Sequence, residues 1–280
     1  MTSETERPLE QKLTQWIASQ GYPLEMLTAI AFQKQNFNVS LSDYYVDFET
    51  QETREVDVTA LRWSSFDNSV ALQVCFRIEC KSSKDKPWVV FVPEIQRNFW
   101  FPPFDVLSSK ANTAFWLEGL KNPDFTRILK SAPLLHVSRF GYGVTQAFTT
   151  GQDVPYKAIM STVKACVDRV THFDNMLPQH QGDVPRMCCV TIPIIVIEGK
   201  LFECELDSSQ SPKLREVELT SVQWKGNNPH SISPIVHITT KSALDHIVAL
   251  CHETANAIIA LAQENMQSLH EIATILSIDV

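Results

Sequence analysis

The amino-acid sequence predicts a single α/β domain built around a mixed β-sheet. Two segments in which polar and apolar residues alternate, 54–58 and 77–81, predict neighbouring strands with one face in a core. A nearly unbroken apolar run at 188–197 predicts a strand that is buried on both faces. One helical pattern precedes the first three strands and another precedes the apolar run. The predicted order is therefore helix, three strands, helix and strand.

The N-terminal part is predicted to hold two helices and the first strand. Residues 9–19 have the apolar spacing of a short helix. Pro23 separates this segment from a second helix, 24–35, and can open it because proline is favoured in the first helical turn. The segment 39–48 then predicts the first strand.

The second and third strands are predicted to form an antiparallel hairpin that folds at Asn68, within a cluster of turn-forming residues. This register places Asp57 opposite Glu79 and Glu55 opposite Lys81. Directly opposed residues lie about 4.5–5.5 Å apart, so these four charged side chains share one face. The apolar side chains of both strands are expected on the other face: Val56, Val58, Ile78 and Cys80.

After the hairpin, residues 82–87 predict a polar turn and 88–92 a short apolar strand. Residues 93–155 interrupt the pattern and are predicted to be an insertion into the core. Two short helices are expected within it, 112–120 and 124–130. Its aromatic segment, 97–104, predicts either a packed irregular core segment or a surface on which single-stranded bases stack.

A helix at 156–175 is predicted before the buried strand, in which Pro193 indicates an edge position or a bulge. A turn at 198–200 is expected to lead into a further strand. Strands are then predicted at 217–224 and 234–240. A long apolar helix from 241 either covers the sheet or pairs with a second copy of the chain.

These elements divide residues 1–280 into three parts of one domain. The core is expected at about 9–92 and 156–206. The insertion covers about 93–155 and the C-terminal extension, strands plus helix, about 207–280.

Composition narrows the classes of function. The chain has 280 residues with a formal net charge of −8, which argues against a protein that coats nucleic acid non-specifically. Its first residues lack a signal-peptide core, and no apolar run has the length of a membrane span, so we expect a cytoplasmic protein. The seven cysteines include no C-x-x-C pair, and we expect them to be buried and reduced.

The charged face of the hairpin predicts a metal site. Three carboxylates beside one ammonium repel one another and are costly to bury without a ligand. Magnesium prefers such oxygen ligands, and a neighbouring lysine can orient a metal-bound water. The alternative is a surface hairpin with a cross-strand salt bridge, a common feature of small energetic value.

Asp57, followed after a hairpin by Glu79-Cys80-Lys81, resembles the motif of the PD-(D/E)XK nuclease superfamily. The run 54–57 is similar to the acidic strand of that family, although the proline often written in the motif is absent. The resemblance covers about 22–92 and a helix and strand at 156–198. It implies a restriction-endonuclease-like αβββαβ core with a mixed sheet.

The resemblance also implies a Mg²⁺- or Mn²⁺-dependent nuclease. Asp57 and Glu79 would ligate the metal directly, and Cys80 would contribute its backbone carbonyl while its side chain faces the core. Lys81 would act on the attacking water. These implied catalytic residues are therefore Asp57, Glu79 and Lys81.

Four further residues each have two alternative roles. Glu55 is either another metal ligand or a partner of Lys81. Glu25, in the first turn of the second helix, either joins the metal site or only interacts with the helix dipole. Lys84 and Lys86 form either a patch for the phosphate backbone or a solvated turn.

By this resemblance the expected substrate is DNA rather than RNA, and the expected role is phage defence or DNA repair. The alternative is a non-catalytic nuclease-like module that binds a protein partner, or a second copy of the chain, through 93–155 or the C-terminal helix. The acidic net charge favours this alternative, whereas the mutually repelling cluster favours catalysis.

Overall fold

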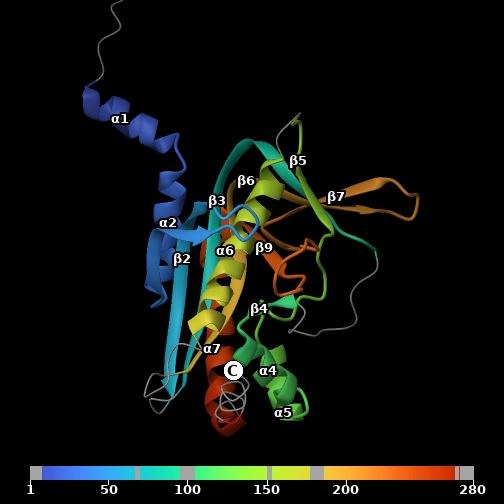
Figure 1. Ribbon diagram of the computed structural model, residues 1–280. Helices are drawn as coiled ribbons and strands as arrows, with labels where there is room; N and C mark the ends of the chain where they lie inside the picture. The colour runs from blue at the N-terminus through green and yellow to red at the C-terminus, as the bar shows by residue number, and fades with distance from the viewer. Residues whose placement is uncertain are drawn as a thin grey trace, which may run out of the picture.

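Figure 1 shows the computed structural model of the chain, which describes residues 8–66, 70–94, 105–149, 153–176, 186–268 and 271. Its centre is a nine-stranded mixed sheet with the main order β1-β2-β3-β6-β9-β8. Helices pack on both faces, so the predicted α/β class with a mixed sheet is confirmed.

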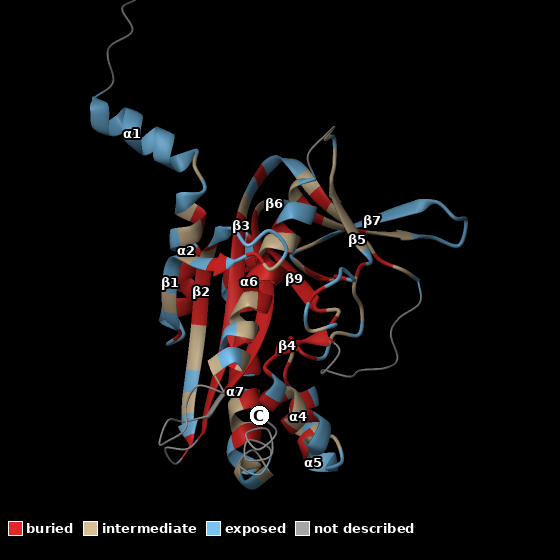
Figure 2. Cartoon of the chain, viewed as in Figure 1, coloured by how far each residue is buried: buried red, intermediate tan, exposed pale blue. Residues whose placement is uncertain are grey.

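Two helices precede the first strand, β1 (Asn38–Val46). The first, α1 (Leu9–Ala18), has no buried residue and extends away from the sheet (Figures 1 and 2). The second, α2 (Tyr22–Lys34), buries Leu24, Thr28 and Phe32, which are spaced four apart and therefore share one side of the helix. Asn36 ends this segment with a positive φ of 60°.

The hairpin of β2 (Thr53–Phe66) and β3 (Val70–Phe91) has the predicted register, with Val58 opposite Ile78. Its turn, 67–69, lies outside the described residues. The ladder between these strands ends at that pair, and β2 continues along β1 alone. Glu55 consequently pairs with Tyr44 of β1, and the prediction that it lies opposite Lys81 is wrong.

Asp57 lies where the side chains of β2 change from one face of the sheet to the other. Ser42 on β1 has a φ of 52°, and neither Ser42 nor Asp57 belongs to a pair in the β1–β2 ladder. After this irregularity Val56 packs with Tyr45 and Ala165, whereas Val58 packs in the cluster on the opposite side of the sheet. The expectation that Val56 and Val58 share a face is therefore wrong.

The predicted turns at 82–87 and 198–200 are both parts of long strands. β3 continues to Phe91, and β6 (Arg186–Leu206) runs parallel beside it. Ser83 pairs with Gly199, but the next pair is Trp88 with Leu201, so residues 84–87 form a bulge. A Cβ atom at Gly199 would lie 2.3 Å from the Ser83 carbonyl oxygen, so only glycine permits this close approach.

β6 is a central strand, and its pairing with β3 keeps one register through Pro193, so neither the edge position nor the bulge that Pro193 suggested is present. On one side it pairs with β3. On the other side it pairs with β4 (Leu107–Ser108) up to Thr191 and with β9 (Ile235–Thr240) from Ile194. Pro193 lies at the gap between these two partners, where a missing amide hydrogen interrupts the ladder least.

The remaining elements complete the two faces of the sheet. α6 (Val154–Met176) packs on one face, while α2 and α7 (Leu244–Glu264, after a short 3₁₀ turn, Lys241–Ala243) pack on the other. Figure 2 shows the buried residues concentrated along these layers. The apolar stripe of α7 is buried against the chain's own sheet, so this helix covers the sheet, as one of the two alternatives predicted.

The segment predicted to be an insertion, 93–155, contributes strands to the sheet. It supplies β4, the helices α4 (Lys110–Gly119) and α5 (Pro123–Lys130), and β5 (Gly143–Gln146), which pairs with the end of β3. The aromatic segment 97–104 lies outside the described residues. The C-terminal part adds β8 (Leu219–Gln223) and β9, close to the predicted strands, and also β7 (Pro212–Val217), which was not predicted.

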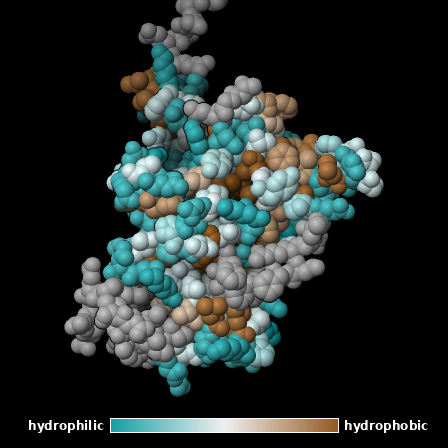
Figure 3. Space-filling model, turned by 45° about the vertical axis from the view of Figure 1, so that its right-hand side comes forward, coloured by the Kyte–Doolittle hydropathy of each residue, from teal (hydrophilic) through white to brown (hydrophobic). Residues whose placement is uncertain are grey.

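The seven cysteines are all free thiols and six are buried, in agreement with the prediction. Among the described helices, none is both long and apolar enough to cross a membrane. On the face drawn in Figure 3, hydrophilic side chains predominate and hydrophobic ones form scattered patches.

Candidate active site

Asp57 is fixed to the neighbouring strand by its carboxylate. It lies one residue beyond the last β2–β3 pair, and its Oδ2 accepts a hydrogen bond of 2.6 Å from the backbone N–H of Cys80. A hydrogen bond to an ionised acceptor is stronger than one between neutral groups. The predicted juxtaposition of Asp57 with 79–81 is therefore present.

Lys81 lies beside both carboxylates. Its Nζ is 3.7 Å from Asp57 Oδ2 and forms an ion pair with Glu79 Oε1. Burial opposes the charge on this ammonium, but Glu79 and Asp57 outweigh burial and raise the pKa of Lys81 above its ordinary value. Lys81 is therefore a cation in this state and acts as a hydrogen-bond donor.

Glu79 is the most buried member of the group, with 7% of its surface exposed. Burial raises its pKa to about 7; the adjacent Asp57 adds to the shift, whereas Lys81 opposes it. Ser161 on α6 donates a hydrogen bond of 3.3 Å to Glu79 Oε2. The Tyr45 hydroxyl lies 3.2 Å from Ser161 Oγ and extends this chain to β1.

Glu25 approaches the group from α2, as one of its two predicted roles requires. Burial raises the pKa of Glu25, and the negative charges of Asp57 and Glu55 raise it further. Glu55 is exposed and lies in the β1–β2 ladder. The salt bridges of Lys81 go to Asp57 and Glu79, so the predicted partnership of Glu55 with Lys81 is absent among the described contacts.

Cys80 separates the site from the core. Its thiol lies 3.6 Å from Thr28 Oγ1 on α2, and burial raises the pKa of this thiol well above its ordinary value. The side chain thus faces the core as predicted. The backbone N–H of Cys80 donates to Asp57. The backbone carbonyl of Cys80 is the group that the resemblance predicts to be a metal ligand.

A half-buried ion pair, Arg77 with Asp43, lies near the site. Arg77, 2% exposed, donates hydrogen bonds of 2.6 Å to Asp43 Oδ2 and 2.7 Å to Thr59 Oγ1. Burial would raise the pKa of Asp43, but Arg77 holds it below its ordinary range. This pair links β1, β2 and β3 two residues before Glu79.

The oxygen atoms of Asp57 and Glu79 are the type of ligand that a hard divalent cation prefers. Within the part of the chain that the structure describes, no cluster of three or more histidine, cysteine, aspartate or glutamate side chains is arranged to hold a metal ion. Asp57 and Glu79 supply two carboxylates, and Mg²⁺ is commonly bound by one or two carboxylates together with waters. In this structure Lys81 supplies the positive charge beside both carboxylates.

Sequence reasoning missed Ser161, Tyr45 and Arg77 as supports of this site. Arg77 lies in the alternating run 77–81 on the same strand face as Glu79, and this spacing is the signal that could have found it. Ser161 is one polar residue on a long helix. Nothing in its local pattern indicates that it meets Glu79.

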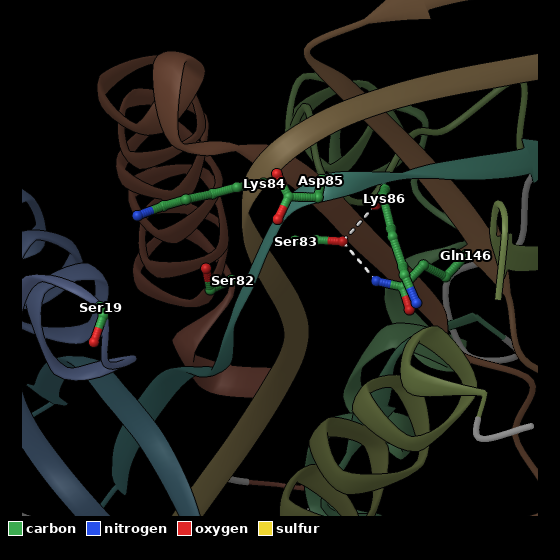
Figure 4. Close-up of a pocket in the computed structure, with 7 residues that line it drawn as sticks. All are labelled: Ser19, Ser82, Ser83, Lys84, Asp85, Lys86 and Gln146. Atoms are coloured by element: carbon green, nitrogen blue, oxygen red, sulfur yellow. Dashed lines mark hydrogen bonds between the residues drawn. The ribbon is translucent and has the colours of Figure 1, made fainter.

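Lys84 and Lys86 lie on the bulge of β3 that follows Lys81. Lys84 Nζ forms a salt bridge of 3.1 Å with Glu198 Oε2. Figure 4 shows both lysines beside Ser82, Ser83, Asp85 and Gln146. The two lysines therefore lie on a bulge and not in a turn. Whether they form a patch for the phosphate backbone stays a prediction.

No known protein-family model, no curated protein and no solved structure matches this chain. The likeness to the PD-(D/E)XK superfamily rests on the motif residues and on the order of the elements.

Proposed function

We propose that the chain is a divalent-metal-dependent nuclease that hydrolyses phosphodiester bonds, with DNA as the leading substrate. The observation that carries the proposal is the convergence of Asp57, Glu79 and Lys81 from adjacent strands, with the lysine beside both carboxylates. The element order α2-β1-β2-β3-α6-β6 supports a restriction-endonuclease-like core.

Each residue has a definite role in this proposal. Asp57 and Glu79 would hold Mg²⁺ or Mn²⁺, with the Cys80 carbonyl as a third oxygen donor. When bound, the metal stabilises negative charge on the scissile phosphate and on the leaving oxygen. Lys81 donates hydrogen bonds that orient the attacking water and neutralise the phosphate.

The two outer glutamates are assigned different roles. Glu25 faces the charges of Asp57 from α2 and adds negative potential to the metal site. Glu55 is exposed on the β1–β2 side, and we assign it no ligand role. With a net charge of −8, the affinity for nucleic acid depends on local basic residues.

Phage defence or DNA repair is a proposed biological role by analogy with the superfamily alone. A non-catalytic interaction module is the second candidate. The Lys81–Glu79 ion pair favours it, because this pair balances charge within the site without a ligand. The two candidates differ in their response to metal.

Cleavage of supercoiled plasmid, linear DNA and RNA in Mg²⁺, Mn²⁺ or EDTA tests the proposal. We expect metal-dependent cutting that Glu79→Ala and Lys81→Ala abolish. Glu216→Gln, on an exposed glutamate of β7, is the matched control and should cut normally. Thermal unfolding with and without metal accompanies the assay, since a ligand of the folded state stabilises it.

The combined outcomes separate the candidates. Cutting that survives both substitutions would contradict the assigned site. Absence of both cutting and metal stabilisation would leave the interaction module as the better description. Metal stabilisation that depends on Glu79, without cutting of any substrate, would indicate that a partner or activator is required.

A further inference from the structure

The bulge of β3 is a fixed structure. Residues 84–87 have no partner on β6, because the ladder passes from Ser83–Gly199 directly to Trp88–Leu201. Ser83 Oγ donates a 2.6 Å hydrogen bond to the Lys86 carbonyl and accepts one of 2.7 Å from Gln146 Nε2. Figure 4 shows these two bonds meeting at Ser83. Bulges of this kind are frequent beside active sites, where they redirect side chains.

A polar cavity of about 370 Å³ opens at this bulge. Three separate parts of the chain line it: the end of α1, the bulge of β3 and the end of β5. The lining residues are Ser19, Ser82, Ser83, Lys84, Asp85, Lys86 and Gln146. Hydroxyl, amide and ammonium donors predominate, which is the set that binds phosphate oxygens.

The local charge is positive although the chain as a whole is acidic. Glu198 is shared between Lys84 at 3.1 Å and Lys241 at 2.8 Å. Lys86 is exposed, and among the described residues it forms no salt bridge. Asp85 lies in the same lining and opposes an anion, so binding would depend on the lysines.

The cavity adjoins the proposed site along one strand. Ser83 is two residues beyond Lys81, which is a distance of about 7 Å at the rise of a β-strand. Both side chains lie on the same face of β3, because side chains alternate along a strand. A group held at the bulge is therefore a near neighbour of one held at Lys81.

We infer that this cavity binds a backbone phosphate of the substrate strand next to the scissile phosphate, with Lys86 and Lys84 as the cationic contacts and the second amide hydrogen of Gln146 as a neutral donor, while Ser83 holds Lys86 and Gln146 in place. This inference rests on the proposed nuclease function and adds a binding subsite to it. Its ligand is nucleic-acid phosphate, and the cavity fixes where the substrate lies relative to Lys81.

Oligonucleotide binding over a series of salt concentrations, in EDTA to prevent cleavage, tests this inference. Each lost phosphate contact should lower the slope of log affinity against log salt by about 0.7 for single strands or 0.9 for duplexes. We expect this change for Lys86→Ala and for Lys84→Ala. Lys213→Ala, on an exposed lysine of β7, is the matched control and should keep the wild-type slope.

A substitution of opposite sign strengthens the test. Asp85→Asn removes the opposing charge and should tighten oligonucleotide binding. Inorganic phosphate, added in a parallel thermal unfolding series, should stabilise the wild type more than Lys86→Ala if the cavity also takes the free anion. Equal stabilisation of the two proteins would mean that free phosphate does not bind in the cavity, which then accepts phosphate only as part of nucleic acid.

The inference is overturned if the binding curves of Lys86→Ala and Lys213→Ala coincide at every salt concentration, or if the wild type binds no oligonucleotide. Unchanged binding by Lys86→Ala together with metal-dependent cleavage would remove the subsite and keep the nuclease. Weaker binding by Lys86→Ala without cleavage in any metal would keep the subsite and contradict the nuclease.

Discussion

The Ser161 hydroxyl on α6 donates a hydrogen bond to Glu79 Oε2 on β3, at 3.3 Å. This contact joins the helix on one face of the sheet to the most buried carboxylate of the site. The Tyr45 hydroxyl lies 3.2 Å from Ser161 Oγ, so the orientation of Glu79 depends on three separate elements. Ser161 is thus placed to position Glu79.

Ser161→Ala should weaken metal binding. The substitution removes a neutral donor to a carboxylate, worth about 1 kcal/mol or roughly a fivefold change in affinity. The change in Mn²⁺ affinity is measured by thermal unfolding of both proteins over a series of Mn²⁺ concentrations. Ser161→Thr keeps a hydroxyl and should retain most of the affinity. Equal loss in both variants would mean that the side-chain volume, and not the hydrogen bond, is important.

Metal binding should strengthen as pH rises towards neutrality. Burial raises the pKa of Glu79 to about 7, so the carboxyl is protonated below that value and must lose its proton to become a ligand. Mn²⁺ affinity, measured between pH 5.5 and 8, should increase up to about pH 7 and then level off. A flat profile over this range would contradict a ligand role for Glu79.

His237 should reduce the stability of the protein in mild acid. It is buried on β9 beside Ser221, and burial lowers its pKa to about 4. Because the pKa is lower in the folded state, the unfolded chain binds the proton more tightly. Stability is therefore retained above the unfolded pKa of about 6.5 and is lost as pH falls towards 4, by up to about 3 kcal/mol.

Denaturant unfolding of the wild type and His237→Gln between pH 4 and 8 measures this effect. The difference in unfolding free energy between the two proteins should change over pH 4–6.5 and stay constant above pH 7. A constant difference over the entire range would contradict the assigned titration. Lys81 and Glu79 are shared by both proteins, so their contributions cancel.

Gly199→Ala should destabilise the fold at the bulge. The new Cβ would lie 2.3 Å from the Ser83 carbonyl oxygen, so the backbone of β3 or β6 must shift. Overpacking of this kind costs about 1–3 kcal/mol. Gly143→Ala is the matched control, since its nearest neighbour would be 4.0 Å away, and its unfolding free energy should change little.

The hairpin was predictable because its determinants are local. Alternating residues on both strands and the turn-forming cluster around Asn68 set one register, and Val58 lies opposite Ile78 as that register requires. The same register is sufficient to bring Asp57 close to Glu79 and Lys81. The resemblance to a nuclease motif depends on the same three positions.

Other features depend on partners far away in the sequence. The polar residues of 84–87 have the composition of a turn, and only the pairing of β3 with β6 on both sides makes them a bulge. Pro193 suggested an edge position or a bulge, because a residue inside a ladder normally needs an amide hydrogen and proline has none. The gap between β4 and β9 removes that requirement. The switch of faces at Asp57 coincides with a positive φ at Ser42 on β1, and a serine gives no sequence indication of that conformation.

The parallel pairing of β3 with β6 has a consequence for the order of folding. Glu79 is adjacent in space to Ile195, which lies more than a hundred residues later in the chain. When the hairpin leaves the ribosome, β6 has not yet been synthesised, so one side of β3 is unpaired. Because distant parallel contacts close slowly, the nascent chain passes through a stage in which this strand edge is exposed to other chains.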